Sequence, residues 1–269
     1  MSTSVVESAI RRLANTMRIY GEEFIRYPAL VAVDQEEAIE NLDRAFEAKL
    51  EAFHTLYDVS KGLMKYFDHA DTSLIIALRN ALHHQNHPLF CSLLPELWLK
   101  GNPERLLGAA FLLARHTSIS GAPSPMGHYI KLDDIYLRLD PGKQSPYLDS
   151  VASAERIERR FRLLEDGLAL QDIWGKAKRE RYPDEQVYLD VMPIFISAVA
   201  RTFIALEAAG MQFKGFDADT YKKPFTSELQ INLKSLEFRS LRMNDLQILL
   251  GPKLTLSQAA IEYPTEPQT

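Results

Sequence analysis

Residues 34–67, DQEEAIENLDRAFEAKLEAFHTLYDVSKGLMKYF, decide the fold class that the sequence predicts. Asp34 is a good N-cap, and Glu36 and Glu37 place negative charge in the first helical turn, where the helix dipole favours it. Apolar residues then recur mostly at steps of three and four, which is the period of one buried stripe on a long helix. The residues of this stripe are Ile39, Leu42, Phe46, Leu50, Phe53, Tyr57, Leu63 and Phe67.

The same helical period extends on both sides of this stretch. Pro88 stops one of these helices, and Gly210 closes the last of them. The sequence therefore predicts an all-α fold, a helical bundle of five to six helices. The further helices are expected at about residues 5–20, 73–87, 103–116, 150–181 and 184–209.

Residues 117–150 have a different composition, because glycine and proline are dense there and predict a long decorated loop. Within it, residues 129–139 alternate on both sides of Asp133 and Asp134, a pattern that allows a short β-hairpin. Near the C-terminus, Leu229, Ile231 and Leu233 alternate like a short strand, and a helix is the alternative there.

These patterns divide the chain into two segments of one domain. Residues 1–210 are expected to form the helical bundle. Residues 211–269 are expected to form a C-terminal extension of mixed or irregular structure packed on it, with a disordered tail from about residue 263.

Composition excludes several classes of protein. The chain has 269 residues, 46% hydrophobic and 25% charged, with a net charge of −5, so a disordered chain and a broadly basic nucleic-acid coat are excluded. The single cysteine, Cys91, excludes an intrachain disulfide and a Cys-rich zinc site. No apolar run reaches the roughly 20 residues of a membrane span, and the first residues lack the apolar core of a signal peptide. We therefore expect a cytoplasmic protein that does not enter a membrane.

The most informative segment for function is residues 73–87, SLIIALRNALHHQNH. On a helical wheel its polar side chains fall within about 160° of arc, opposite an apolar face. Arg79 carries a planar guanidinium that matches phosphate oxygens, and imidazoles exchange protons near neutral pH. The face carries no acid, so it suits an anionic phosphate. Its other members are Asn80, His83, His84, Asn86 and His87.

Arg79, Asn80 and His84 match the Arg-Asn-x-x-x-His motif, and the segment resembles the HEPN superfamily of small helical proteins. The resemblance implies a metal-independent endoribonuclease with no cofactor, acting as a toxin or in phage defence. Arg79 would hold the scissile phosphate, Asn80 would support it, and His84 would transfer the proton. It also implies a homodimer with facing motifs, and an antitoxin or regulatory protein as a possible partner.

Other residues of the chain extend or compete with this hypothesis. His83 and His87 are candidates for substrate binding, as are Arg156 and Arg160, which lie in a stretch of interleaved basic and acidic residues. The strongest alternative is a non-catalytic HEPN-like helical dimer that binds a nucleotide, RNA or a protein partner.

Two metal-based alternatives are weaker. His83 and His87 have the spacing of two zinc ligands on a helix, but no third ligand lies nearby in the sequence. Glu51 and His54 have the spacing of one di-iron ligand pair, and such bundles need two pairs. No metal site is therefore predicted.

Overall fold

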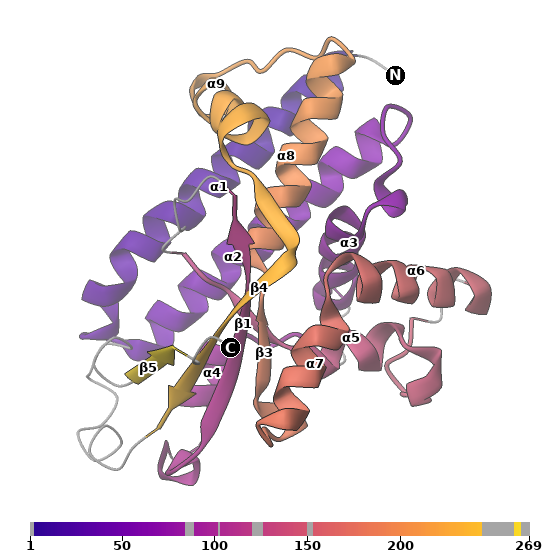
Figure 1. Cartoon of the computed structure of the whole chain (residues 1–269). Coiled ribbons are helices and arrows are strands. Elements are labelled where there is room, and N and C mark those ends of the chain that lie inside the picture. Colours follow the sequence, from indigo (N-terminus) through magenta and orange to yellow (C-terminus); the bar gives the residue numbers. More distant parts are fainter. Residues whose placement is uncertain are drawn as a thin grey trace.

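The computed structural model describes residues 3–83, 89–101, 103–119, 126–149, 153–243 and 261–264. These residues form a mixed α/β fold with nine α-helices and a five-stranded sheet (Figure 1). The prediction of an all-α bundle of five to six helices is therefore wrong. The sheet has the strand order β2-β3-β1-β4-β5.

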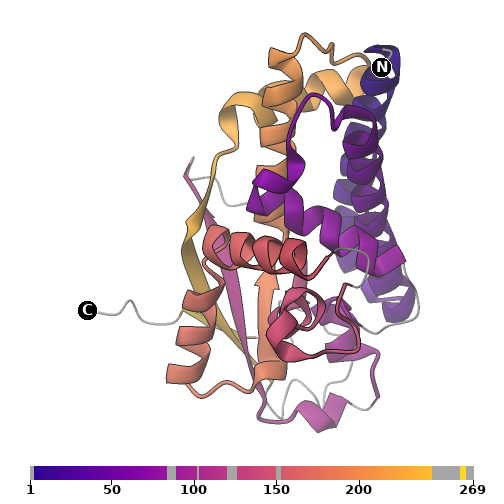
Figure 2. The ribbon, with the colours of Figure 1, turned by 90° about the vertical axis from the view of Figure 1, so that its right-hand side faces the viewer.

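The helical half is built on two long antiparallel helices, α1 (Thr3–Val31) and α2 (Gln35–Ser60), which lie side by side in both views (Figures 1 and 2). Asp34 caps α2 as predicted, because its side chain accepts a hydrogen bond of 2.9 Å from the Glu37 backbone N–H. Helices α3 (Ala70–His83) and α8 (Met192–Ala208) pack against each other, and α3 also packs on α2.

The sheet is organised around β1 (Ala110–Ser118), which has partners on both sides. It pairs in parallel with β3 (Val187–Asp190) and antiparallel with β4 (Ile231–Arg242). The outer strands are β2 (Tyr129–Lys131), antiparallel to β3, and β5 (Ile261–Pro264), antiparallel to β4. β4 comes from the predicted C-terminal extension, so the sheet joins the two segments that the sequence suggested.

Burial on both faces explains why β1 was not predicted. Leu112 and Ala114 face the main core, whereas Phe111 and Leu113 face a second core that contains Trp98. A strand buried on both faces reads as a continuous apolar run, without the alternation that marks a half-buried strand. The predicted helix over residues 103–116 is therefore wrong, and its first residues form only a 3₁₀ turn.

The two long helices predicted next are each divided. Residues 150–181 contain α6 (Ala154–Gly167) and α7 (Leu170–Arg179), separated at Ala169, whose φ of +51° cannot continue a right-handed helix. Residues 184–209 begin with a 3₁₀ turn and the fully buried strand β3, and α8 starts only at Met192, with Pro193 in its first turn.

The predicted long loop also contains regular structure. The β-hairpin over residues 129–139 is wrong, because β2 leads directly into helix α5 (Leu132–Leu139). Asp133 and Asp134 lie in the first turn of α5, where the helix dipole favours negative charge, and do not form a hairpin turn. The Asp134 carboxylate also accepts a 2.7 Å hydrogen bond from the Phe90 backbone N–H.

Shorter elements complete the described fold. The 3₁₀ turns are η1 (Tyr66–Asp68), η2 (Pro103–Leu106), η3 (Pro141–Lys143) and η4 (Asp184–Gln186). The other short helices are α4 (Leu93–Trp98), α9 (Phe216–Lys223) and the π-helical η5 (Pro224–Glu228). The predicted disordered tail lies outside the described residues, apart from β5.

Candidate functional sites

The motif helix α3 is held firmly at its N-terminal end. Asp71 is completely buried there, and both its carboxylate oxygens lie near the Arg201 Nε, at 3.0 and 3.2 Å. Ser197 donates a 2.7 Å hydrogen bond to the same carboxylate. Most of the following residues are buried, and Arg79 and Asn80 are partly exposed. The buried apolar residues are Leu74, Ile75, Ile76, Ala77, Leu78 and Ala81.

Arg79 is fixed by an ion pair that the sequence did not predict. Its Nε and Nη2 donate hydrogen bonds of 3.0 Å to the two carboxylate oxygens of Glu51 on α2. Its Nη1 lies 3.4 Å from the Asn80 Oδ1, so Arg79 and Asn80 are side by side. The Arg79 side chain is 19% exposed and that of Glu51 is 40% exposed.

This bidentate pair has two opposing consequences for phosphate binding. It orients the guanidinium and leaves the Nη1 edge, next to Asn80, as the side that can meet a phosphate oxygen. It also places the Glu51 carboxylate beside the Arg79 guanidinium, and this negative charge weakens the attraction of the guanidinium for a phosphate. Glu51 was noticed in the sequence only for its spacing from His54.

The histidines of the motif are not placed by the structure. His84 and His87 lie outside the described residues, and for His83 only the helical backbone is described. The proposed proton-transfer residue, and the spacing of His83 from His87, therefore stay predictions from the sequence. Within the described ranges no group of three His, Cys, Asp or Glu side chains could hold a metal ion.

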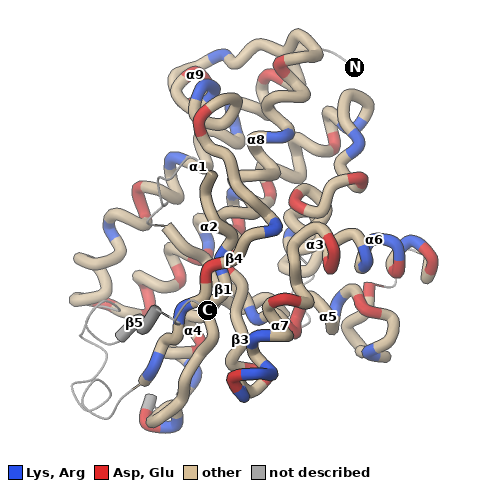
Figure 3. Tube along the Cα trace, viewed as in Figure 1, with Lys and Arg blue, Asp and Glu red and all other residues tan. Residues whose placement is uncertain are grey.

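Of the two arginines predicted to bind substrate, one lies on the surface and one is engaged inside the fold. Arg156 is exposed on α6, where basic and acidic residues alternate (Figure 3). Arg160 donates a 2.8 Å hydrogen bond to the Ser73 carbonyl on α3 and lies 3.8 Å from the Asp149 carboxylate. Both line a hollow of about 610 Å³ beside Phe67. Arg160 thus connects α6 to the motif helix.

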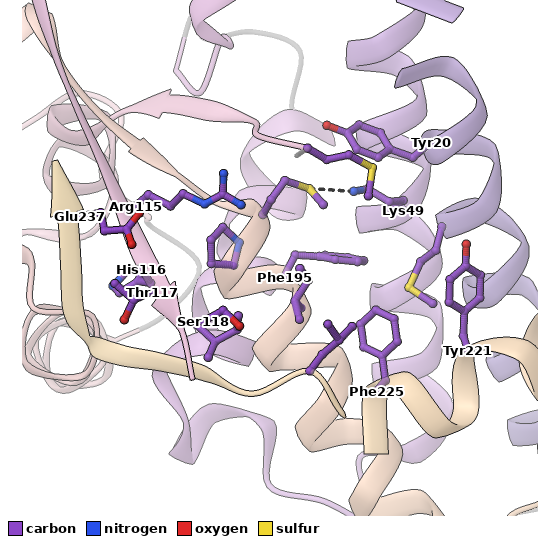
Figure 4. A pocket seen from close by; sticks show the side chains of 17 residues that line it. Tyr20, Lys49, Arg115, His116, Thr117, Ser118, Phe195, Tyr221, Phe225 and Glu237 are labelled. Carbon is purple, nitrogen blue, oxygen red and sulfur yellow. Dashed lines mark hydrogen bonds between the residues drawn. The ribbon is translucent and has the colours of Figure 1, made fainter. Parts of the chain in front are cut away.

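A second site lies at the carboxyl end of β1, next to α8. There a cavity of about 510 Å³ is enclosed by α1, α2, the start of α8 and the segment between α9 and β4 (Figure 4). Ligands of α/β proteins bind preferentially at the carboxyl ends of parallel strands, and β1 and β3 are such a pair. The cavity walls are mainly apolar, from Met17, Met126, Met192, Phe195, Ile196, Phe225, Leu229 and Ile231.

Lys49 is the unusual residue of this cavity. Its side chain is 1% exposed, and its Nζ lies 3.5 Å from the centre of the Tyr20 ring and 4.5 Å from that of Phe195. Among the described residues its hydrogen-bond acceptor is the Met192 Sδ at 3.1 Å, a weak acceptor for an ammonium group. Burial holds the pKa of Lys49 well below its usual value, against the opposing effect of Asp190.

Asp190 is the charged group next to Lys49 at the end of β3. Its Oδ1 accepts 3.0 Å hydrogen bonds from the backbone N–H groups of His128 and Met192. Its Oδ2 lies 3.5 Å from the Arg115 Nε. Burial raises the pKa of Asp190 to about 6, although Arg115 lowers it, and burial lowers the pKa of His128 to about 3.

The position of Lys49 in the sequence indicates an unusual residue, although the helical period of the apolar residues does not show it. Lys49 lies three residues after Phe46 and one before Leu50, within the apolar stripe of α2. A lysine in such a stripe is almost never fully buried without a partner. Lys49 and Glu51 are about 200° apart around α2, so the cavity and the motif lie on opposite sides of this helix.

Comparisons with known proteins add no relative to this picture. The chain matches no protein-family model, no curated protein and no solved structure. Across the described part of the chain, no helix combines the length and apolar character needed to cross a membrane. Function must therefore be inferred from the chemistry of the two sites.

Proposed function

We propose that this protein is a HEPN-type, metal-independent endoribonuclease that works as a homodimer through Arg79, Asn80 and His84. The observation that carries the proposal is the placement of Arg79. Glu51 fixes its guanidinium on a partly exposed face of α3, and its Nη1 edge lies beside Asn80. A guanidinium held in one orientation suits the planar geometry of phosphate oxygens.

In the proposed reaction, a ribose 2′-hydroxyl attacks the adjacent phosphorus and the 5′-oxygen leaves. The 2′-hydroxyl loses a proton and the leaving oxygen gains one, so the products are a 2′,3′-cyclic phosphate and a 5′-hydroxyl. His84 transfers a proton, Arg79 stabilises the charge that develops on the phosphate, and Asn80 positions it. No metal or cofactor takes part.

The dimer follows from the spacing of the motif. Positions 79 and 84 diverge by about 140° around a helix, so one chain cannot easily direct both side chains at one phosphate. Two copies related by a two-fold axis could combine Arg79 of one with His84 of the other. A toxin or phage-defence role, held in check by an antitoxin or regulatory protein, belongs to the same proposal.

The test is cleavage of a 5′-labelled RNA by the purified protein in excess EDTA. We expect Arg79→Ala and His84→Ala each to lower the cleavage rate by roughly 10²-fold or more, the scale of losing a charge-stabilising or proton-transfer group. Arg18→Ala is a matched control, because Arg18 also forms ion pairs on a helix, with Glu22 and Asp217. Wild-type cleavage rates in His84→Ala, or a monomer in light scattering, would contradict the proposal.

Glu51→Gln tests the positioning role of the ion pair. Removing the carboxylate charge should strengthen RNA binding, because Arg79 then has no countercharge, and should make binding more salt-dependent. The cleavage step should become slower, because the guanidinium is no longer held in one orientation. A fall in kcat together with a fall in KM is the expected signature, and a change in neither would refute the role of Glu51.

The ion pair between Arg79 and Glu51 also favours a second candidate function. A neutralised arginine suits a non-catalytic HEPN-like dimer that binds a nucleotide, RNA or a protein partner without cleaving it. This alternative predicts that RNA is bound but stays intact in the wild type, and that Arg79→Ala weakens binding alone. Release of a 2′,3′-cyclic phosphate by the wild type would exclude it.

A further inference from the structure

We propose that the cavity beside Lys49 binds a small monocarboxylic acid with an apolar body, whose carboxylate is held by the Lys49 ammonium and the Tyr20 hydroxyl. This site is separate from the motif on α3, since Lys49 and Glu51 lie on opposite sides of α2. Its volume of about 510 Å³ lies within the range of small-molecule sites, which is roughly 300–1,000 Å³.

The residues that line the cavity indicate that the body of the ligand is apolar. Three methionines, Met17, Met126 and Met192, line it together with the rings of Phe195 and Phe225. Methionine side chains are flexible and polarisable, so they adapt to apolar ligands of varied shape. Polar side chains also line the cavity, among them Thr117, Ser118 and Tyr221, but the apolar residues outnumber them.

Two donors at the buried end indicate the head of the ligand, because one has no hydrogen-bond partner among the described residues and the other has only a weak one. The Tyr20 hydroxyl is buried and has no hydrogen-bond partner among the described residues. The Lys49 ammonium has a thioether as its acceptor and aromatic rings around it. A carboxylate has two oxygens and one charge, so it can accept from both donors and pair with the cation. A phosphate carries more charge and needs more donors than this end provides.

Positive groups lie close to this end of the cavity. Arg115 extends from β1 toward it (Figure 4). The nearby buried carboxylates are those of Asp190, whose Oδ2 lies 3.5 Å from the Arg115 Nε, and of Asp43, which acts on the Tyr20 hydroxyl. Glu237 faces Arg115 across the β1–β4 ladder, and its exposed side chain is screened by water. The Lys49 Nζ itself is contacted by a thioether and aromatic rings, so a ligand carboxylate would be its charge partner.

The experiment compares octanoate with octan-1-ol, which share an apolar chain and differ in the head group. Isothermal titration calorimetry should show that the wild type prefers octanoate by more than about tenfold. Lys49→Met keeps the length and apolar character of the side chain but removes its charge, and should reduce this preference to within about twofold. Lys61→Met, an exposed lysine at the end of the same helix, is the matched control and should retain the preference.

Proton uptake provides an independent readout. Binding of an anion raises the pKa of Lys49, so octanoate should bind with uptake of a proton in the pH range between the lowered pKa of Lys49 and its ordinary value of 10.5, measured in buffers of different ionisation enthalpy. Among the titratable groups nearby, burial lowers the pKa of His128, raises that of Tyr20, and raises those of Asp190 and Asp43 to about 6 and about 7, so these carboxylates take up no proton in the alkaline part of the range. The uptake should therefore disappear in Lys49→Met.

Equal affinity of the wild type for octanoate and octan-1-ol, or no binding of either, would overturn the proposal. A preference for octanoate that persists in Lys49→Met would also overturn it. If Lys49→Met does not fold, Tyr20→Phe decides, because it should lower the affinity for octanoate several-fold and leave that for octan-1-ol unchanged. RNA cleavage should survive in Lys49→Met, so failure here and failure of the ribonuclease proposal are distinguishable.

Discussion

Replacement of the buried Lys49 by methionine is expected to stabilise the protein in the absence of ligand. Lys49 is 1% exposed and its Nζ is surrounded by the rings of Tyr20, Phe46 and Phe195, with the Met192 sulfur as acceptor. Methionine fills nearly the same volume, packs well against aromatic rings and needs no hydrogen bond.

The size of the effect follows from the lowered pKa of Lys49. Each unit of pKa difference between the folded and unfolded states corresponds to about 1.4 kcal/mol. Replacing a whole buried ion pair by apolar residues of similar volume stabilises proteins by roughly 1–4 kcal/mol in known cases, and Lys49→Met breaks no such pair, because the Nζ contacts a thioether and aromatic rings. We therefore expect Lys49→Met to raise the free energy of unfolding by about 1–4 kcal/mol at pH 7.

The pH dependence makes this prediction specific. In the pH range between the lowered pKa of Lys49 in the fold and its ordinary value of 10.5, the unfolded chain binds a proton that the folded chain does not. The stability of the wild type therefore rises with pH in this range, by up to about 1.4 kcal/mol per pH unit. The advantage of Lys49→Met should shrink over the same range and disappear above about pH 10.5.

Urea unfolding followed by circular dichroism, at several pH values from neutral to alkaline, measures this difference. Lys61→Met, which changes an exposed lysine, should stay within about 0.5 kcal/mol of the wild type at every pH. A Lys49→Met variant that is less stable than the wild type would contradict the prediction that the buried lysine destabilises the fold. A stability difference that does not change with pH would show that the pKa of Lys49 is not lowered in the fold.

Two other substitutions test the packing and the buried acids. Gly167→Ala should lower the free energy of unfolding by about 1–3 kcal/mol, measured by thermal unfolding, because the new Cβ would clash with the Cβ of Ala70. An unchanged stability would contradict this close contact of α6 with α3. Asp43→Asn should stabilise the protein more at pH 8 than at pH 5. Burial raises the pKa of Asp43 to about 7, so its unfavourable charging in the fold develops as pH rises from its ordinary value of 3.8. Equal effects at both pH values would show that Asp43 titrates normally.

Helices with local signals can be predicted from the amino-acid sequence alone. Asp34 and the stripe from Ile39 to Tyr57 specify α2, because a cap and a period of 3.6 residues act within a few turns. The alternation at Ile231 and Leu233 allowed a strand or a helix, and the strand is found, since β4 is partly exposed and keeps the period of two.

The strands of the sheet and the residues that contact the candidate sites could be identified only from the folded protein. β1 and β3 are buried on both faces, so their side chains carry no alternation, and their strand identity comes from hydrogen bonds to segments far away in the chain. In the same way, the sequence around Arg79 is that of an ordinary surface arginine. Its ion pair with Glu51, 28 residues earlier, forms only in the folded protein. In the sequence, Lys49 resembles the other charged residues of α2. It is buried only because the end of β3 and the start of α8 pack over it in the folded protein, and such burial cannot be seen in a local stretch of sequence.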